Sequence, residues 1–148
     1  MDKMTISTIT AAEYKLDDIE PGLQKQFHVR ITESMLDEFA KLSGDYTPLH
    51  TNDQYAQTTN FSKKICHGLL LVSFFSQLIG MHLPGKNALC LSHSINYVSP
   101  CFVDDEISVK GEVLSKSNST RIITLKTTIT NNAGKCLIYG QAKVLVRE

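Results

Sequence analysis

The sequence predicts a single α+β domain in which one antiparallel sheet wraps a long apolar helix. Residues 65–85 contain no Asp, Glu, Lys or Arg, and the part from 69 to 79 is strongly apolar. From residue 88 onward, apolar and polar residues alternate in four successive runs separated by turn residues. Successive strands with short turns form antiparallel sheets. A helix that is apolar nearly all round needs cover on every side, and a small sheet leaves an edge or face open. A second copy of the chain could cover this open edge or face, so we also expect a dimer.

The elements follow from periodicity and caps. Residues 1–20 show no sustained period and end before a Pro-Gly pair, which predicts an N-terminal extension ahead of a domain at 21–148. We expect a strand at 26–31, short helices at 32–44 and from 51 or 52 to 57, and the apolar helix at about 67–80. Four strands are predicted at 88–98, 106–117, 121–131 and 136–146. The first short helix should begin at Thr32, end at Gly44 and share an apolar face of Met35, Leu36, Phe39, Ala40 and Leu42.

Composition excludes several classes of protein. The 148 residues carry 15 Lys+Arg and 15 Asp+Glu, so the chain lacks the basic charge of a nucleic-acid binder. Polar residues interrupt the uncharged stretch and Pro84-Gly85 closes it, which argues against a membrane span. The four cysteines have neither zinc-ligand nor disulfide-framework spacing, so we expect free thiols in an apolar interior. The first residues resemble no export signal, and we expect a cytoplasmic protein.

The most unusual local feature is Gly44-Asp45-Tyr46-Thr47-Pro48-Leu49-His50. An acid and an imidazole five residues apart on an irregular loop can converge if the proline turns the chain back. Such a pair could hold a water molecule and deprotonate it. The alternative is that Asp45 forms hydrogen bonds within a turn and that His50 is a hydrogen-bonded surface or cap residue. Spacing alone does not decide between the catalytic and the structural interpretation.

A second feature is Cys66-His67-Gly68, immediately before the apolar helix. Glycine permits close approach of a ligand, and N–H groups at a helix N-terminus could stabilise charge on a carbonyl oxygen. The alternative is an ordinary helix start. Ser76 lies eight residues after Gly68, and mid-helix serines usually bond to a carbonyl one turn earlier. The adjacent pair Lys63-Lys64 could meet phosphate, but two neighbouring lysines are usually just solvated. No nucleotide-binding loop or metal-ligand cluster appears, so we expect no cofactor and no metal.

These features occur together in a recognisable order. The run from Ser43 to His50, then Tyr55-Ala56, Thr58-Thr59, Phe61 and the run from Ile65 to Leu70, resembles the MaoC-like hydratases, and within them the (R)-specific enoyl-CoA hydratases. The resemblance continues through Leu83-Pro84-Gly85-Lys86, Val98-Ser99-Pro100 and Val103-Asp104-Asp105-Glu106, and it covers about residues 23–147.

The resemblance implies a dimeric hot dog fold and reversible hydration of trans-2-enoyl-CoA to (R)-3-hydroxyacyl-CoA, without metal or redox cofactor. By matching positions, Asp45 and His50 correspond to the catalytic pair and Gly68 to the backbone donor facing the thioester oxygen. Ser76 corresponds to a polar residue that supports the catalytic loop, and His67 and Thr47 are also counted as supporting. Thr47 stands where the family usually has Asn, which predicts a less firmly held water and a slower enzyme or altered substrate preference.

Three other functions remain as alternatives. A thioesterase or an acyl-carrier-protein dehydratase could use the same fold. The dehydratases of that kind resemble a scheme that places a Glu or Asp on the central helix, and residues 67–80 hold no carboxylate, which counts against both. A non-catalytic acyl-thioester-binding module is disfavoured by the retained Asp45 and His50. The sequence leaves open the acyl chain length, the choice between CoA and carrier-protein substrates, and whether the product serves polyhydroxyalkanoate synthesis or fatty acid metabolism.

Overall fold

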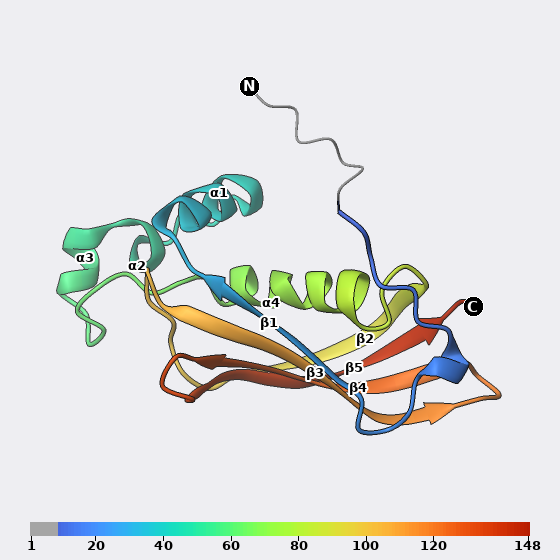
Figure 1. The fold of residues 1–148 in the computed structure, drawn as a ribbon. Coiled ribbons are helices and arrows are strands. Elements are labelled where there is room, and N and C mark those ends of the chain that lie inside the picture. Colours follow the sequence, from blue (N-terminus) through green and yellow to red (C-terminus); the bar gives the residue numbers. More distant parts are fainter. Residues whose placement is uncertain (1–8) are drawn as a thin grey trace.

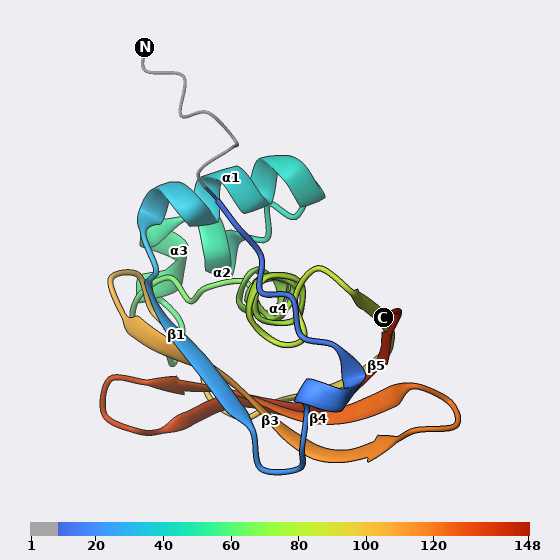
Figure 2. The ribbon, with the colours of Figure 1, turned by 45° about the vertical axis from the view of Figure 1, so that its right-hand side comes forward.

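The computed structural model describes residues 9–148 and contains a five-stranded antiparallel sheet with one helix along one face (Figure 1). The strands are β1 (Gln24–Arg30), β2 (Ala88–Tyr97), β3 (Glu106–Ser117), β4 (Ile122–Asn131) and β5 (Cys136–Val146), in the order β1-β3-β4-β5-β2. The helix is α4 (Gly68–Gln77), and Figure 2, which looks nearly along it, shows the sheet curving beneath it. The predicted wrapped helix and antiparallel sheet are confirmed.

One connection matters for the site. β2 and β3 are consecutive in the chain but not neighbours in the sheet, because β2 pairs with β5 at one edge and β3 lies beside β1. The chain between them crosses the start of α4, where the Cys66 N–H donates to the Cys101 carbonyl over 2.7 Å and Ile65 bridges Phe102. This crossing closes one end of the molecule around the N-terminus of α4.

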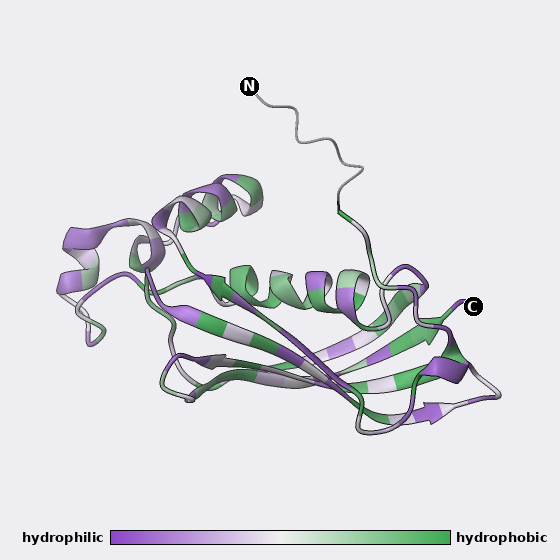
Figure 3. Cartoon of the chain, viewed as in Figure 1, coloured by the Kyte–Doolittle hydropathy of each residue, from purple (hydrophilic) through white to green (hydrophobic). Residues whose placement is uncertain are grey.

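The core lies between α4 and the sheet. Leu70, Leu71 and Phe75 of α4 are buried against strand residues such as Ile107 and Ile138. After α4, a π-helical turn, η3 (Leu78–His82), carries Ile79 toward a second buried cluster, whose members include Leu16, Ile19, Leu83, Ile123, Leu125 and Val144. Each such aliphatic or aromatic side chain contributes about 1.5–3 kcal/mol when fully buried. Figure 3 shows the apolar colour concentrated on α4 and on the strands beneath it.

The expectation that this helix is buried on nearly every side is wrong for the single chain. Leu69 is 62% exposed, and Ser73, Ser76 and Gln77 are also exposed. The neighbouring strand β2 is an edge strand that is exposed along most of its length, and its exposed apolar residues include Leu89, Leu91 and Tyr97. One side of α4 and the edge strand β2 therefore leave apolar surface uncovered.

Three short helices lie beyond the sheet, at the end of the molecule where α4 begins (Figure 1). In α1 (Glu33–Ser43), the Thr32 hydroxyl accepts from the Met35 N–H, and Gly44 ends the helix with a φ of 77°, as its sequence predicts. Leu42 was expected on the apolar face of α1 but is 85% exposed. α2 (Pro48–Thr51) begins at a proline, and Asn52 caps α3 (Asp53–Gln57) by accepting from the Tyr55 N–H.

The predicted N-terminal extension, 1–20, lies partly outside the described residues. Its described part, from residue 9, packs against the domain. Leu16 in the 3-10 turn η2 (Leu16–Asp18) and Ile19 are buried in the second cluster. The Ala12 N–H donates to the Met81 carbonyl, and the Leu16 N–H donates to the Glu148 carbonyl. This segment therefore covers the end of the core opposite to the short helices (Figure 1). No helix in the described part of the chain is long and apolar enough to cross a bilayer.

Candidate active site

Asp45 begins the loop between α1 and α2, and Thr47 fixes its carboxylate. Gly44 turns the chain out of α1, and the Ser43 hydroxyl accepts from the Asp45 N–H at 3.1 Å. Thr47 then donates twice to Asp45 Oδ1, from its hydroxyl over 2.6 Å and from its N–H over 3.0 Å. These hydrogen bonds, foremost that of the hydroxyl, lower the pKa of Asp45 below 3.8, so the carboxylate is ionised at neutral pH. No donor among residues 9–148 bonds to Oδ2, which can therefore accept a hydrogen bond from another molecule.

His50 lies on α2 with one ring nitrogen fixed. Its Nδ1 is 2.8 Å from the Ile65 carbonyl oxygen. Because a carbonyl oxygen can only accept, Nδ1 carries the proton, and in the neutral ring the lone pair is on Nε2. The Ile65 N–H in turn donates to the Leu49 carbonyl over 3.3 Å, so Ile65 is bound to two successive residues of α2. His50 is thus held in the tautomer that a general base at Nε2 requires.

His67, the residue before α4, contacts both Asp45 and His50. Its ring is 2% exposed, stacks on His50 with 4.2 Å between centroids, and meets Phe39 edge-on at 4.9 Å. Its Nε2 is 3.1 Å from the Asp45 carbonyl oxygen and therefore carries a proton, while its buried Nδ1 has no partner among the described residues. His67 holds the backbone of Asp45 against the start of α4.

Gly68 is the first residue of α4, and its N–H has no acceptor within the helix. A Cβ at this position would lie 2.5 Å from Cε1 of Tyr97, which comes from the end of β2. Glycine therefore lets the Tyr97 ring lie directly on the helix start. This close approach is the physical reason for the glycine in the Cys66-His67-Gly68 motif.

These residues surround one cavity of about 560 Å³. Asp45 from the loop, His50 from α2, and His67 and Gly68 from the start of α4 all line it. The rest of the wall is mostly apolar and comes from α1, the segment before α4, α4 itself, the crossing segment and the sheet: Phe39, Phe61, Ile65, Cys66, Leu69, Leu71, Tyr97, Val98, Ser99, Pro100, Cys101 and Ile138. The cavity combines the carboxylate of Asp45, the imidazoles of His50 and His67, and an amide at a helix N-terminus, a set suited to adding or removing water next to a carbonyl group.

Ser76 is not part of this cavity within one chain. It lies two turns further along α4, on a second cavity of about 380 Å³ that also includes Val72, Phe75, Ile79, Gly80, Ala88, Cys90 and His93. The mid-helix bond to a preceding carbonyl is formed by Ser73, whose hydroxyl donates to the Leu70 carbonyl over 2.5 Å. Thr47 does not line the first cavity either, and it acts on the site through Asp45.

Three features of the site were not predicted from the sequence. Tyr97 packs on Gly68, and only the fold brings the end of β2 to the start of α4. Lys64, expected to be solvated, is 7% exposed and ion-paired with Glu33 and Asp53. The cysteines differ among themselves, since Cys66 and Cys101 are buried at the cavity whereas Cys90 is exposed.

The thiol of Cys66 lies against that of Cys101. Their hydrogen bond and burial raise the pKa of Cys66 far above its usual value of 9.0, so this thiol is not a nucleophile. The described residues contain no group of three His, Cys, Asp or Glu that could hold a metal ion.

Comparison with known proteins identifies the family of the chain. Residues 17–134 match the MaoC like domain family. The chain belongs to this family. This MaoC-like domain is 37% identical over 126 residues to the (R)-specific enoyl-CoA hydratase of Aeromonas caviae, which is 85% of this chain and 94% of that protein.

Solved structures confirm the hot dog fold. The MaoC-like domain resembles the (R)-hydratase from A. caviae involved in PHA biosynthesis with a TM-score of 0.84 and 37% identity, covering 86% of this chain and 97% of that one. It resembles the R-hydratase PhaJ1 from Pseudomonas aeruginosa with a TM-score of 0.89 and 30% identity, covering 93% and 88%.

Proposed function

We propose that this MaoC-like domain catalyses the reversible hydration of trans-2-enoyl-CoA to (R)-3-hydroxyacyl-CoA. One observation carries the proposal: Asp45, His50 and Gly68 line a single, largely apolar cavity. The relatives named (R)-specific enoyl-CoA hydratase match this chain over most of its length, which supports the substrate class and the stereochemistry.

In the proposed mechanism, Asp45 and His50 hold and activate one water molecule. Thr47 donates two hydrogen bonds to Oδ1 of Asp45, which leaves Oδ2 to accept a hydrogen bond from the water. The Ile65 carbonyl accepts the Nδ1 proton of His50, which leaves the Nε2 lone pair to accept a second hydrogen bond from the water. As the water oxygen bonds to C3 of the enoyl group, one of its O–H bonds breaks and the proton passes to the pair. The pair then gives this proton to C2, and the second hydrogen of the water remains on the new hydroxyl group. General acid–base help of this kind contributes about 10²–10⁴-fold.

Negative charge collects on the thioester oxygen as C3 is attacked. We propose that the Gly68 N–H donates to this oxygen, aided by the partial positive charge at the start of the ten-residue helix α4. Losing one such donor typically costs about 3 kcal/mol of transition-state stabilisation. The reaction needs only water as co-reactant, so no metal or redox cofactor enters the proposal.

We further propose a homodimer that covers the exposed side of α4 and the edge strand β2. The uncovered apolar residues Leu69, Leu89 and Leu91 lie on these two elements, and β2 pairs with another strand on one side only. Ser76 lies on the same exposed side of α4, so its supporting role would be exercised within such a dimer. Light scattering should give twice the mass of the chain, and Leu91→Glu should shift the protein toward monomer. A wild-type mass of one chain would contradict the dimer.

The four free thiols are consistent with a reducing compartment, and we propose the cytoplasm. Fractionation of cells with an antibody against the protein tests this. Recovery of the protein outside the cytoplasmic fraction would contradict it.

Two substrates test the reaction. Purified protein is incubated with crotonyl-CoA, and loss of the enoyl absorbance and formation of 3-hydroxybutyryl-CoA are followed. The product is then offered separately to (R)- and (S)-specific dehydrogenases. Parallel incubation with butyryl-CoA and a thiol reagent detects hydrolysis. The proposal predicts hydration, an (R) product and no thiol release. Thiol release from butyryl-CoA would indicate a thioesterase instead, and binding without turnover would indicate a non-catalytic module.

A further inference from the structure

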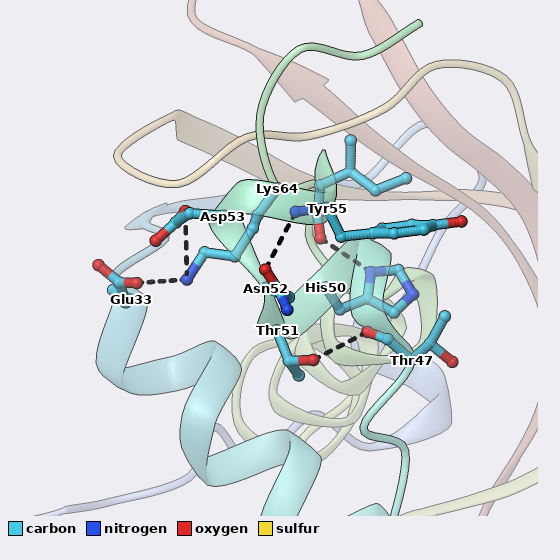
Figure 4. A network of polar contacts seen from close by, with 9 residues as sticks. Glu33, Thr47, His50, Thr51, Asn52, Asp53, Tyr55 and Lys64 are labelled. Carbon is cyan, nitrogen blue, oxygen red and sulfur yellow. Dashed lines mark hydrogen bonds and ion pairs between the residues drawn. The ribbon is translucent and has the colours of Figure 1, made fainter. Parts of the chain in front are cut away.

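Lys64 does not line the cavity, and it is one of the few polar or charged residues that are buried in the described part of the chain. Its ammonium group hydrogen-bonds Glu33 at the start of α1 and lies 3.8 Å from Asp53 at the start of α3 (Figure 4). The bond with Glu33, together with the charges of Glu33, Asp53 and Asp37, raises the pKa of Lys64 above 10.5 despite its burial. The lysine is therefore a permanent cation that joins two helices.

The residue after Lys64 fixes the imidazole of the site. The Ile65 carbonyl accepts the Nδ1 proton of His50 at 2.8 Å, and the Ile65 N–H donates to the Leu49 carbonyl at 3.3 Å. Figure 4 shows Lys64 beside the short helices α2 and α3, which carry His50 and Asp53. Asp53 comes three residues after His50 in the chain. The chain at Lys64 and Ile65 thus holds residues 49–53 at three points: one hydrogen bond between backbone groups, one from the His50 imidazole to a backbone carbonyl, and one ion pair.

Removing the ammonium would change more than one contact. Glu33 of α1 and Asp53 of α3 would then lose the cation that they share, and the ion pairs that join the two helices through Lys64 would be gone. Because Ile65 is bonded to the same short helices, its carbonyl would no longer be held at one distance from His50. The imidazole could then exchange its proton between Nδ1 and Nε2 and lose the lone pair that faces the cavity.

We propose that Lys64 is a positioning residue for His50, acting through the Ile65 carbonyl. This inference rests on the proposed hydratase function. Lys64 touches no reacting atom, and its effect is to keep His50 in the Nδ1-protonated tautomer and in one orientation. Lys64 does not line the cavity, although its neighbour Ile65 does, so the loss of Lys64 lowers kcat by a larger factor than it raises KM.

The test compares Lys64→Met, Lys64→Arg and the matched control Lys63→Met. Methionine keeps an unbranched stem without charge, and arginine keeps the charge. Lys63, the adjacent lysine, is exposed, with its ammonium 4.6 Å over the Phe102 ring. Lys64→Met should reduce kcat for crotonyl-CoA by about 10- to 100-fold, the cost of a displacement of about 1 Å in a catalytic group. Lys64→Arg should retain most of kcat, and Lys63→Met should match the wild type.

A second readout does not depend on turnover. In ¹⁵N-histidine spectra, with His50→Gln used for assignment, wild-type His50 should show a protonated Nδ1 and an unprotonated Nε2. Lys64→Met should show averaging of the two nitrogen signals, and Lys64→Arg should not. If wild-type protein proves inactive, the proposed function fails, while this spectrum still tests the role of Lys64.

Two results would overturn the inference. One is a Lys64→Met protein with wild-type kcat and a wild-type His50 spectrum. The other is a variant with reduced thermal stability but unchanged kcat well below its melting temperature, which would make the network structural only. If Lys64→Met does not fold, Glu33→Gln, at an exposed carboxylate, should shift kcat and the spectrum in the same direction by a smaller amount. An unchanged Glu33→Gln protein would then overturn the inference.

Discussion

Gly68→Ala tests the reason for the glycine at the start of α4. The added Cβ would lie 2.5 Å from Tyr97 Cε1 and 2.9 Å from Cδ1. Ordinary carbon–carbon contacts are about 3.5–4.0 Å, so the ring must move by about 1 Å. Tyr97 is 57% exposed and can move, which places the cost at the low end of the ~1–3 kcal/mol of overpacked sites. Alanine recovers part of this through helix propensity, worth up to ~1 kcal/mol.

We therefore expect Gly68→Ala to lose at most about 1 kcal/mol of stability, which is at most ~2–4 °C in Tm for a chain of this size. The catalytic loss should be larger, because a displacement of about 1 Å at the site costs on the order of 10²-fold. The assays are thermal unfolding at fixed protein concentration and kcat/KM for crotonyl-CoA. Both are measured in a cycle with Tyr97→Ala.

The cycle isolates the contact between Gly68 and Tyr97. In the Tyr97→Ala background, the same Gly68→Ala change should cost little stability, because the ring is gone. An equal stability loss in both backgrounds would refute the steric explanation, and the glycine would need another reason.

Two further predictions concern groups whose pKa is shifted. Thr47→Val removes the hydroxyl that contributes most to the low pKa of Asp45, so a ¹³C-carboxyl NMR titration should show that pKa rising toward 3.8, while Thr47→Ser leaves it low; equal titration of the two variants would contradict this. Burial lowers the pKa of His93 below 6.5, so the unfolded chain binds more protons there and stability falls as the pH drops below about 6.5. Urea unfolding between pH 7.5 and 5 should show a shallower pH dependence for His93→Gln, and an unchanged slope would count against that assignment.

Much of the fold could be predicted because local patterns agree with the tertiary structure. The alternating runs after residue 88 became β2 to β5, and Thr32, Gly44 and Asn52 cap helices as their residue types favour. The order of the strands could not be predicted from periodicity, because alternation defines the faces of a strand and not its neighbours. The connection from β2 to β3 across the start of α4 is a property of the whole sheet.

The candidate site divides in the same way. Asp45, His50, His67 and Gly68 lie in two short motifs, and the structure brings both motifs to one cavity. Contacts between distant segments left no trace in the sequence: Tyr97 on Gly68, and Lys64 with Glu33 and Asp53. The burial of Lys64 depends on where three separate elements meet, and a pair of adjacent lysines does not reveal it. Leu42 shows the converse, an apolar residue that the last turn of α1 leaves exposed.

The most direct test of the account is the rate at which Asp45→Asn hydrates crotonyl-CoA. Asparagine keeps the size of the side chain and can still accept from Thr47, so circular dichroism and the unfolding midpoint should match the wild type. Without the carboxylate, the account predicts a loss of at least about 10²-fold in kcat. A folded Asp45→Asn protein that hydrates crotonyl-CoA at close to the wild-type rate would contradict the central claim that Asp45 and His50 activate the attacking water.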